Sequence, residues 1–382
     1  MFLALSEMRR ARTRFALLSA AVGLLVFLIL FQQSLLDGLV TKFIGAIRTQ
    51  DAQVLVLSRD AKGDLEGSRL TLAQLPDVAA VGGVADYGRL VVGSYTISTR
   101  TSQVDPDPKL RLIDASVWGY DLGSIGGPKS LVDGVRPSQP NEILAPTGFE
   151  DQGLTLGATV RIEPGDIELK IVGRAKDLVY GVRPALFMAW DTVTQAAAAR
   201  NPDAGEISPT AFVFKPVPGT SAGALVDQIN GAFPEVQALT RVDAADNAPV
   251  VASVSTTFST IINLLRFVVL LTCGLFFLIL TAQKTSTLTV LRAMGAKSST
   301  LVTALLIQVV FVVLAGAVLA SILQLLVSIP LKKVGVSLDP VSALTTTAVV
   351  LVLALIGTAL GAIRRIVKID PAAATGLQGA SS

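Results

Sequence analysis

The sequence predicts an α-helical membrane protein with four transmembrane helices and a large α+β extracytoplasmic domain inserted between the first helix and the second. Two observations predict this fold class. Apolar residues make up 51% of the 382 residues, and the mean hydropathy of +0.61 is too high for an ordinary soluble chain of this length. The apolar residues are also gathered into four runs, each long enough for the ~20 residues of helix that cross a bilayer core.

The four apolar runs give the order of elements along the chain. They cover residues 15–36, 258–282, 301–329 and 341–363. Residues 51–255 lie between the first run and the second, have the composition of a soluble chain, and are numerous enough for one or two domains. The sequence therefore predicts one transmembrane helix, an inserted domain, and then three more transmembrane helices.

Basic residues predict which side of the membrane each end of the chain occupies. Arginine and lysine gather before the first run and after the last, at Arg9, Arg10, Arg12, Arg14, Arg364, Arg365 and Lys368. Because positively charged flanks stay in the cytoplasm, both termini are predicted to be cytoplasmic, including the tail 364–382, and the inserted domain to lie outside. Lys332 and Lys333 would then lie on the outer side. These two basic residues oppose the predicted orientation, and the seven at the ends of the chain favour it.

Residues 1–14 predict an interfacial helix on the membrane surface, because apolar side chains are interleaved with arginines. A secretory signal peptide is the alternative, since a basic stretch also precedes an apolar run there. No small-x-small cleavage site follows Phe31, and Gln32, Gln33 and Asp37 come instead. We therefore expect the first apolar run to be retained as a membrane anchor.

The first helix is predicted to continue beyond the bilayer. Apolar residues at helical spacing extend past the first run to Ile47, interleaved with Asp37 and Arg48. Segment 15–50 therefore predicts a transmembrane helix followed by an amphipathic outer stalk. A similar amphipathic stretch begins the helix 256–282 and predicts a second stalk. Two stalks that flank one domain would couple the orientation of this domain to tilts of the membrane helices.

Short strands and helices are predicted within the inserted domain. Strand signals occur at residues 53–57, 91–97, 160–163, 169–172 and 211–214. Two short helices, 70–75 and 222–233, are each followed by a proline, Pro76 or Pro234, that is expected to end the helix before an extended segment. This repeated pattern predicts two α+β lobes with a mostly β insertion at 110–173.

The loop 283–300 between the second and third helices is predicted to lie at the cytoplasmic membrane surface, because its charged residues are costly in hydrocarbon. Apolar residues crowd around Arg292 in this loop, and Gly295 offers a helix stop. An ordinary basic inner loop is one interpretation of the segment. A solvated connector need not be amphipathic, however, so we favour a short rigid helix that a soluble partner binds.

The helices 301–329 and 341–363 complete the predicted membrane region. Pro330 ends the first of them, and a short outer loop connects the two. The polar and small residues within the two helices are expected to mediate helix packing: Gln308 and Gln324 by hydrogen bonds, Gly316 and Gly361 by close backbone contact.

Several function classes are excluded by composition. The chain has no histidine and one cysteine, Cys273, which excludes intrachain disulfides, histidine-based catalytic triads and histidine-ligated metals. The nearest approach to a phosphate-binding G-x-x-x-x-G-K-[ST] motif, residues 295–298, lacks the second glycine before the lysine. We therefore predict a non-catalytic membrane subunit without metal or cofactor, whose energy comes from an ATPase in another chain.

Three stretches resemble a known family once this order of helices is in place. Residues 289–297, TVLRAMGAK, resemble a segment before the third helix of type VII ABC transporter permeases, the group that includes MacB, FtsX, LolC and HrtB. Residues 365–373, RIVKIDPAA, are similar to the C-terminal ending of these permeases, and residues 153–160, GLTLGATV, to a hairpin in their external domain. The N-terminal EMRRARTRF and the chain length look nearest to actinobacterial members, including HrtB-like ones.

The resemblance implies a function and a site. It implies a permease of the bacterial cytoplasmic (inner) membrane that couples ATP hydrolysis by a separate ATPase to export or extraction of a drug, heme, lipid or lipoprotein. FtsX-like signalling to an extracytoplasmic cell-wall hydrolase, without cargo transport, is the alternative. The implied ATPase-coupling helix consists of Thr289, Val290, Leu291, Arg292, Ala293, Met294, Gly295, Ala296 and Lys297.

The resemblance also implies partners. It implies two copies of the ATPase subunit and a second permease protomer, as a homodimer, in contact with membrane lipid. The signalling alternative adds an extracytoplasmic protein partner. No feature of the sequence indicates nucleic acid as a partner.

Asn263 and Arg266 form the candidate substrate entrance in the second helix. An arginine at the bilayer centre costs about 2.5 to 3.5 kcal/mol, so Arg266 either attracts an anionic group, such as a lipid phosphate or a propionate, or extends its side chain outward to water. Heme export would need a transient iron ligand or a flat apolar slot, and without histidine the candidate ligands are methionine, tyrosine, cysteine or carboxylates. The outward-facing choices in the inserted domain are Tyr87, Tyr95, Tyr120, Tyr180 and Met188.

Overall fold

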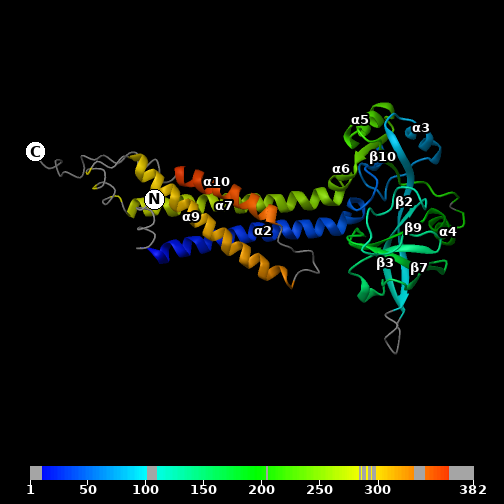
Figure 1. Cartoon of the computed structure of the whole chain (residues 1–382), viewed down its shortest axis with the longest axis horizontal. Helices are drawn as coiled ribbons and strands as arrows, with labels where there is room; N and C mark the ends of the chain where they lie inside the picture. The colour runs from blue at the N-terminus through cyan, green and yellow to red at the C-terminus, as the bar shows by residue number, and fades with distance from the viewer. Residues whose placement is uncertain are drawn as a thin grey trace, which may run out of the picture. The chain divides into compact units, whose positions relative to one another are not determined.

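The computed structural model describes residues 11–100, 110–203, 205–283, 298–330 and 340–360, together with Thr285, Val290 and Met294. The chain divides into two compact units. Unit 1 comprises Met1–Gly38 and Thr256–Ser382, and unit 2 comprises Leu39–Ser255. Figure 1 labels several elements of each unit. Most of the interfacial helix predicted at 1–14 lies outside the described residues.

Unit 1 is built from helices that are long and apolar enough to cross a membrane. The described residues contain four of them: α2 (Arg12–Arg48), α7 (Pro249–Gln283), α9 (Ser298–Ser328) and α10 (Pro340–Thr358). Side chains from all four share one apolar core, in which Val22, Phe277 and Val312 are fully buried. A large domain of strands and short helices lies between α2 and α7 in the sequence, so the predicted fold class is confirmed.

Two pairs of glycines bring these helices into backbone contact. A Cβ atom on Gly23 of α2 would lie 2.9 Å from the carbonyl oxygen of Gly316 of α9. A Cβ atom on Gly274 of α7 would lie 2.9 Å from the carbonyl oxygen of Gly357 of α10. Small residues allow such close approach where lipid supplies no hydrophobic driving force between helices. Gly316 therefore has the packing role predicted for it, whereas Gly361 lies outside the described residues.

Polar side chains inside unit 1 differ in how they are satisfied. The hydroxyl of Thr346 on α10 donates a hydrogen bond to Oε1 of Gln33 on α2 at 2.9 Å. Gln324 on α9 is buried, and its carboxamide makes no hydrogen bond to the described residues. The expectation that Gln324 bonds to another helix is therefore wrong for the described part of the chain.

Unit 2 is organised by one mixed sheet. The described strands form a sheet of eleven in the order β11-β1-β10-β2-β3-β9-β5-β7-β4, with β6 on β2 and β7 and with β8 on β9. The strands are β1 (Val54–Ser58), β2 (Val84–Arg100), β3 (Leu110–Tyr120), β4 (Asp133–Gly134), β5 (Glu142–Pro146), β6 (Thr159–Glu163), β7 (Ile167–Ala175), β8 (Val179–Tyr180), β9 (Arg183–Ala189), β10 (Ala211–Pro216) and β11 (Val236–Thr240).

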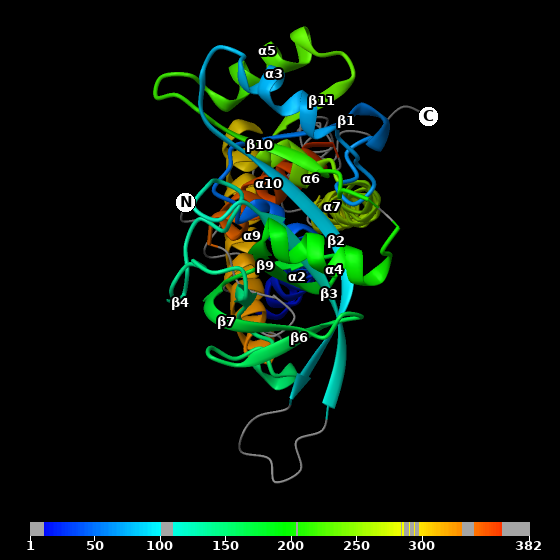
Figure 2. The same ribbon diagram turned by 90° about the vertical axis from the view of Figure 1, so that its right-hand side faces the viewer.

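Strand β2 runs through both halves of this sheet (Figure 2). Its first part pairs with β10 and its second part with β3 and β6. The helices of unit 2 are α3 (Leu75–Ala79), α4 (Trp190–Arg200), α5 (Ala222–Ala232) and α6 (Arg241–Asp246), with short 3-10 turns η1 (Arg59–Ala61), η2 (Leu72–Gln74) and η3 (Glu150–Gln152). The strand predicted at 91–97 is therefore only the middle of a longer strand that both lobes share.

Each lobe has its own apolar core. The first contains side chains of β1, β10 and α5, among them Val56, Phe214 and Ile229. The second contains side chains of β3, β7, β9 and α4, among them Val117 and Leu186. Pro234 follows α5 as predicted, but Pro76 lies in the first turn of α3 instead of ending a helix. Proline is tolerated there because a first-turn N–H has no partner within the helix.

Candidate functional site

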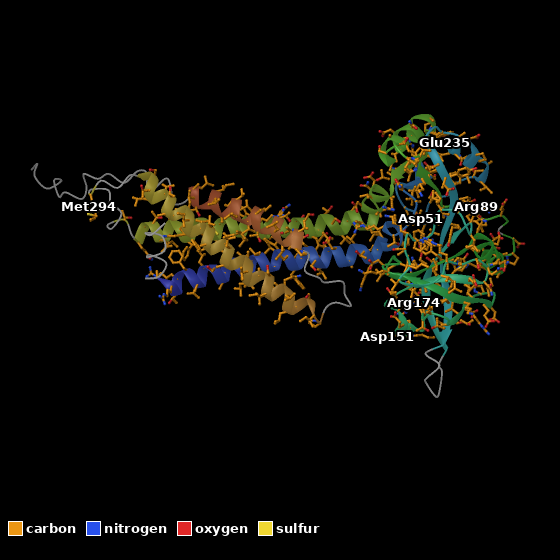
Figure 3. The ribbon with its side chains drawn as sticks, in the orientation of Figure 1. Asp51, Arg89, Asp151, Arg174, Glu235 and Met294 are labelled. Atoms are coloured by element: carbon orange, nitrogen blue, oxygen red, sulfur yellow. The ribbon has the colours of Figure 1, made fainter. Side chains whose placement is uncertain are left out.

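The candidate coupling segment lies between α7 and α9, and two of its nine residues are described. Val290 is helical, and the amide nitrogen of Met294 donates a hydrogen bond to the carbonyl oxygen of Val290 at 3.0 Å, which is the spacing of one α-helical turn. The side chains are 53% and 70% exposed, respectively. Figure 3 labels Met294. The remaining predicted coupling residues, Thr289, Leu291, Arg292, Ala293, Gly295, Ala296 and Lys297, lie outside the described residues.

Both ends of this segment are attached to packed helices. At the end of α7, Oε1 of Gln283 accepts a hydrogen bond from Nη1 of Arg14 at 2.8 Å. One residue further along α2, the ring of Phe15 meets the ring of Phe276 edge to face, with centroids 6.3 Å apart. The segment therefore starts from a helix end that α2 holds in place, and α9 begins at Ser298 on its other side.

The candidate substrate entrance is one turn of α7. Nη1 of Arg266 donates a hydrogen bond to Oδ1 of Asn263 at 3.1 Å, and this pair is exposed. The apolar side chains of Leu264 and Phe267 are exposed beside it. No carboxylate of the described residues forms an ion pair with Arg266. The guanidinium group therefore retains donors that can bind an anionic group, in agreement with either interpretation made from the sequence.

The tyrosines and the methionine expected to face outward are mostly buried in unit 2. Tyr95, Tyr120 and Met188 belong to the buried interior, and burial raises the pKa of both tyrosines. The ring of Tyr180 packs edge to face on Trp118 with centroids 5.4 Å apart, while Tyr87 is exposed. The sequence left the choice among these five residues open, and three of them, Tyr95, Tyr120 and Met188, are buried in the core.

The hairpin motif at 153–160 is observed, and the C-terminal motif at 365–373 lies outside the described residues. Gly153 and Gly157 both have positive φ, 89° and 81°, which glycine adopts without strain. They lead the chain into β6, which pairs antiparallel with β7 from Thr159↔Lys170 onward. The motif therefore places a turn before an antiparallel hairpin in the second lobe.

Charged residues of unit 2 form structural pairs rather than a reactive cluster. Arg174 bonds to Asp133 and Glu150, and Arg89 bonds to Asp121 while lying over the ring of Trp190 at 4.2 Å. Figure 3 labels the two arginines. The hydrogen bond from Arg174 lowers the pKa of Asp133. No group of three or more acidic or cysteine side chains that could hold a metal ion occurs within the described residues.

A contact between α2 and the β8–β9 hairpin was missed from the sequence. The backbone amides of Gly181 and Val182 donate hydrogen bonds to the carbonyl oxygens of Phe43 and Lys42, each at 3.0 Å. A Cβ atom on Gly45 would overlap the carbonyl oxygen of Asp177. A glycine within a helical pattern, Gly45, is the one signal that could have indicated close backbone approach here.

Comparison with known proteins supports the order of elements described above. The family model described as FtsX-like permease C-terminal matches residues 254–371. The chain is 22% identical over 377 residues to a putative hemin transport system permease protein HrtB of Staphylococcus epidermidis, covering 98% of this chain and 99% of that protein. It is 24% identical over 380 residues to an uncharacterized ABC transporter permease of Mycobacterium tuberculosis, with the same coverage.

Two solved structures align with about half of the chain each. The periplasmic region of MacB from Actinobacillus actinomycetemcomitans aligns with a TM-score of 0.35 and 10% identity, covering 51% of this chain and 91% of that one. The extracellular domain of the noncanonic ABC-type transporter YknZ from Gram-positive bacteria aligns with a TM-score of 0.32 and 13% identity, covering 49% and 98%.

The sequence matches and the four apolar helices together describe a multi-pass membrane protein that is a homologue of ABC transporter permeases. More narrowly, residues 254–371 match an FtsX-like permease domain, and the chain is similar over nearly its full length to permeases named HrtB. The family resemblance predicted from the sequence is thus confirmed. Permeases of this class work with an ATPase subunit.

Proposed function

We propose that this chain couples ATP hydrolysis by a separate ATPase subunit to the export or extraction of a hydrophobic or amphipathic substrate. The exposed side chains of Val290 and Met294, whose backbones share a hydrogen bond, carry the proposal. They are two large apolar side chains between membrane helices, and a soluble partner that covers them would gain hydrophobic free energy. In this assembly two ATPase copies bind a permease homodimer, the chain itself is non-catalytic, and both of its termini lie in the cytoplasm.

Substitution of these two side chains tests this coupling. Met294→Glu should lower permease-stimulated ATP hydrolysis by the cognate ATPase roughly tenfold or more, because a buried unpaired carboxylate opposes docking. Leu112→Glu is the matched control, since Leu112 is an equally exposed apolar side chain in unit 2. Hydrolysis is measured with both subunits in lipid nanodiscs. Wild-type stimulation by the double variant Val290→Glu, Met294→Glu would contradict the proposal.

The proposed entrance for an anionic substrate group is Arg266 with its neighbour Asn263. Hemin is a natural first probe because HrtB relatives are named for hemin transport and hemin carries two propionates. Arg266→Gln keeps a hydrogen-bonding side chain at this position and removes the charge. It should weaken hemin stimulation of the ATPase while leaving basal hydrolysis unchanged. An unchanged hemin response would leave outward extension of Arg266 as its only role.

FtsX-like signalling without cargo is the alternative function, and the match of residues 254–371 to an FtsX-like model is the observation that favours it. The near full-length similarity to permeases named for hemin transport favours cargo. The two functions differ in their response to hydrophobic compounds. A transporter shows substrate-stimulated ATP hydrolysis and substrate accumulation in a deletion strain. A signalling protein shows a division or wall defect and captures an extracytoplasmic hydrolase.

A further inference from the structure

We propose that the β8–β9 hairpin is a rigid joint that fixes the end of α2 to the sheet of unit 2. A movement of this end of α2 is then passed directly to the sheet. Its use in transport depends on the proposed function, but the joint itself can be tested without an ATPase. All residues that form it belong to unit 2, since α2 enters that unit at Leu39.

One turn near the end of α2 is buried on every face, and only the last residue of the helix, Arg48, is exposed beyond it. Ile44, Gly45, Ala46 and Ile47 are four consecutive residues of the helix, and all are buried. Successive helical side chains are rotated by about 100°, so four consecutive buried residues leave no face of this turn open to solvent. A surface helix would instead show one buried stripe. This part of α2 is therefore held within the domain and does not merely lie against it.

The hairpin meets the helix backbone directly. The amides of Gly181 and Val182 donate to two successive carbonyl oxygens of α2, those of Phe43 and Lys42, at 3.0 Å each. The absence of a side chain on Gly45 leaves room for the carbonyl of Asp177 at the start of the hairpin. Two directional hydrogen bonds and one close backbone contact fix both the rotation and the axial position of the helix end.

The turn holds a residue in a conformation that its type disfavours. The two central residues of the hairpin, Gly181 and Val182, have φ of 58° and 66°, the geometry of a type I′ turn. Glycine adopts positive φ without strain, but a β-branched residue at positive φ is an outlier. The side chain of Val182 is 52% exposed, so core packing gives little compensation. The hydrogen bond from its backbone amide to α2 stabilises this conformation instead. A strained backbone conformation persists where the surrounding structure holds it in this way.

Arg183 connects this turn to both lobes. It is the first residue of β9, and its guanidinium donates to the hydroxyl of Ser94 on β2 and to Oε1 of Glu66 at 3.1 Å. Glu66 lies between β1 and η2 in the first lobe. On the opposite strand of the hairpin, Tyr180 packs on the buried ring of Trp118 from β3. One short hairpin therefore joins the helix, the shared strand β2 and a loop of the first lobe.

Hydrogen exchange on the full chain in lipid nanodiscs tests the joint. Gly45→Leu places a side chain where the carbonyl of Asp177 lies, and the amides of residues 178–186 should then exchange roughly tenfold faster. Gly223→Leu is the matched control, because a Cβ atom on Gly223 of α5 meets nothing, and exchange in the hairpin should stay as in the wild type. Wild-type exchange of the hairpin in Gly45→Leu would overturn the joint.

A second variant covers the case in which Gly45→Leu does not fold. Arg183→Gln adds no bulk and removes the charge that faces Glu66. Residues 62–70 and 178–186 should then both exchange faster, whereas a change confined to residues 62–70 would overturn the joint. With the ATPase bound, nucleotide should alter exchange in unit 2 of the wild type but not of Gly45→Leu. If nucleotide does not change hydrogen exchange in unit 2 of the wild type, the proposed function is contradicted. The joint is still tested, because hairpin exchange in Gly45→Leu is measured without the ATPase.

Discussion

At the scale of single residues, a polar side chain inside unit 1 affects stability differently depending on whether it has a hydrogen-bond partner. Gln33 and Thr346 join α2 to α10 through one hydrogen bond, whereas the carboxamide of Gln324 is buried without a bond to the described residues. An unsatisfied buried amide carries a desolvation penalty that an apolar side chain of similar size avoids. The polar side chain of Gln33 therefore stabilises the fold, whereas that of Gln324 destabilises it.

Gln324→Leu is expected to stabilise the protein by about 1 kcal/mol, because the penalty of the buried amide is removed. Gln33→Leu is the contrasting variant, and it should lower stability because Thr346 loses its partner on α2. The midpoint of unfolding in a detergent titration measures both. A lower midpoint for Gln324→Leu would show that this carboxamide has a partner that stabilises the fold.

At the scale of elements, two devices determine how helices and strands meet. Glycine pairs allow the crossing of α2 with α9 and of α7 with α10. At the free edge of the sheet, Asn230 of α5 covers β11: its Nδ2 donates to the carbonyl oxygen of Ala238 at 3.0 Å, and its Oδ1 accepts from the amide of Ala238 at 2.8 Å. The side-chain amide thus takes the place of a further strand, which limits edge-to-edge association.

Gly357→Leu should destabilise the crossing of α7 and α10 by about 1 to 3 kcal/mol, since the new side chain would overlap the carbonyl of Leu270. Ala315→Leu, on an exposed face of α9, is the size-matched control and should have little effect. Thermal unfolding in detergent is the measurement. Equal midpoints for the two variants would show that α7 and α10 separate at little cost.

Asn230→Ala should remove two hydrogen bonds at the edge of the sheet and lower stability by about 1 to 3 kcal/mol. It should also raise aggregation, because the backbone of Ala238 is then free to pair with another chain. Gln228→Ala, an exposed position on the same helix, is the control. Light scattering during heating reports the aggregation, and behaviour identical to the control would contradict the protective role.

At the scale of the whole molecule, the membrane order of the chain followed from composition alone. Apolar runs longer than a bilayer core leave little choice of structure, so the four helices and the inserted domain could be predicted. Pro76 was misassigned because proline both begins and ends helices, and only packing decides which. The β8–β9 hairpin could not be predicted, since strands such as Val179–Tyr180 are too short to show a period of two.

The candidate sites could be predicted only in part, for a physical reason specific to each. The exposure of Val290 and Met294 follows from an apolar segment between charged residues. Tyr95 and Tyr120 could not be placed, because β2 and β3 alternate their side chains between two faces and both faces are covered. The hydrogen bond between Arg266 and Asn263 could have been predicted, because residues three apart are neighbours on a helix.

The predicted orientation in the membrane can be tested by cysteine labelling in intact cells. The native Cys273 is buried, so an added thiol is labelled selectively. Leu112→Cys should react with a membrane-impermeant maleimide, because unit 2 is proposed to lie outside. Met294→Cys should react only after the cells are opened. Labelling of Met294→Cys in intact cells would place the coupling segment on the wrong side for an ATPase.

The strand β2 belongs to two cores at once, with its first part opposite β10 and its last part opposite β6. Neither half of the inserted domain can therefore be cut out as an independent recombinant fragment without stripping the other of a central strand. The same sharing restricts evolutionary recombination. Relatives can trade surface loops at the rim of the sheet, but an exchange of one lobe must carry a compatible copy of residues 84–100 with it.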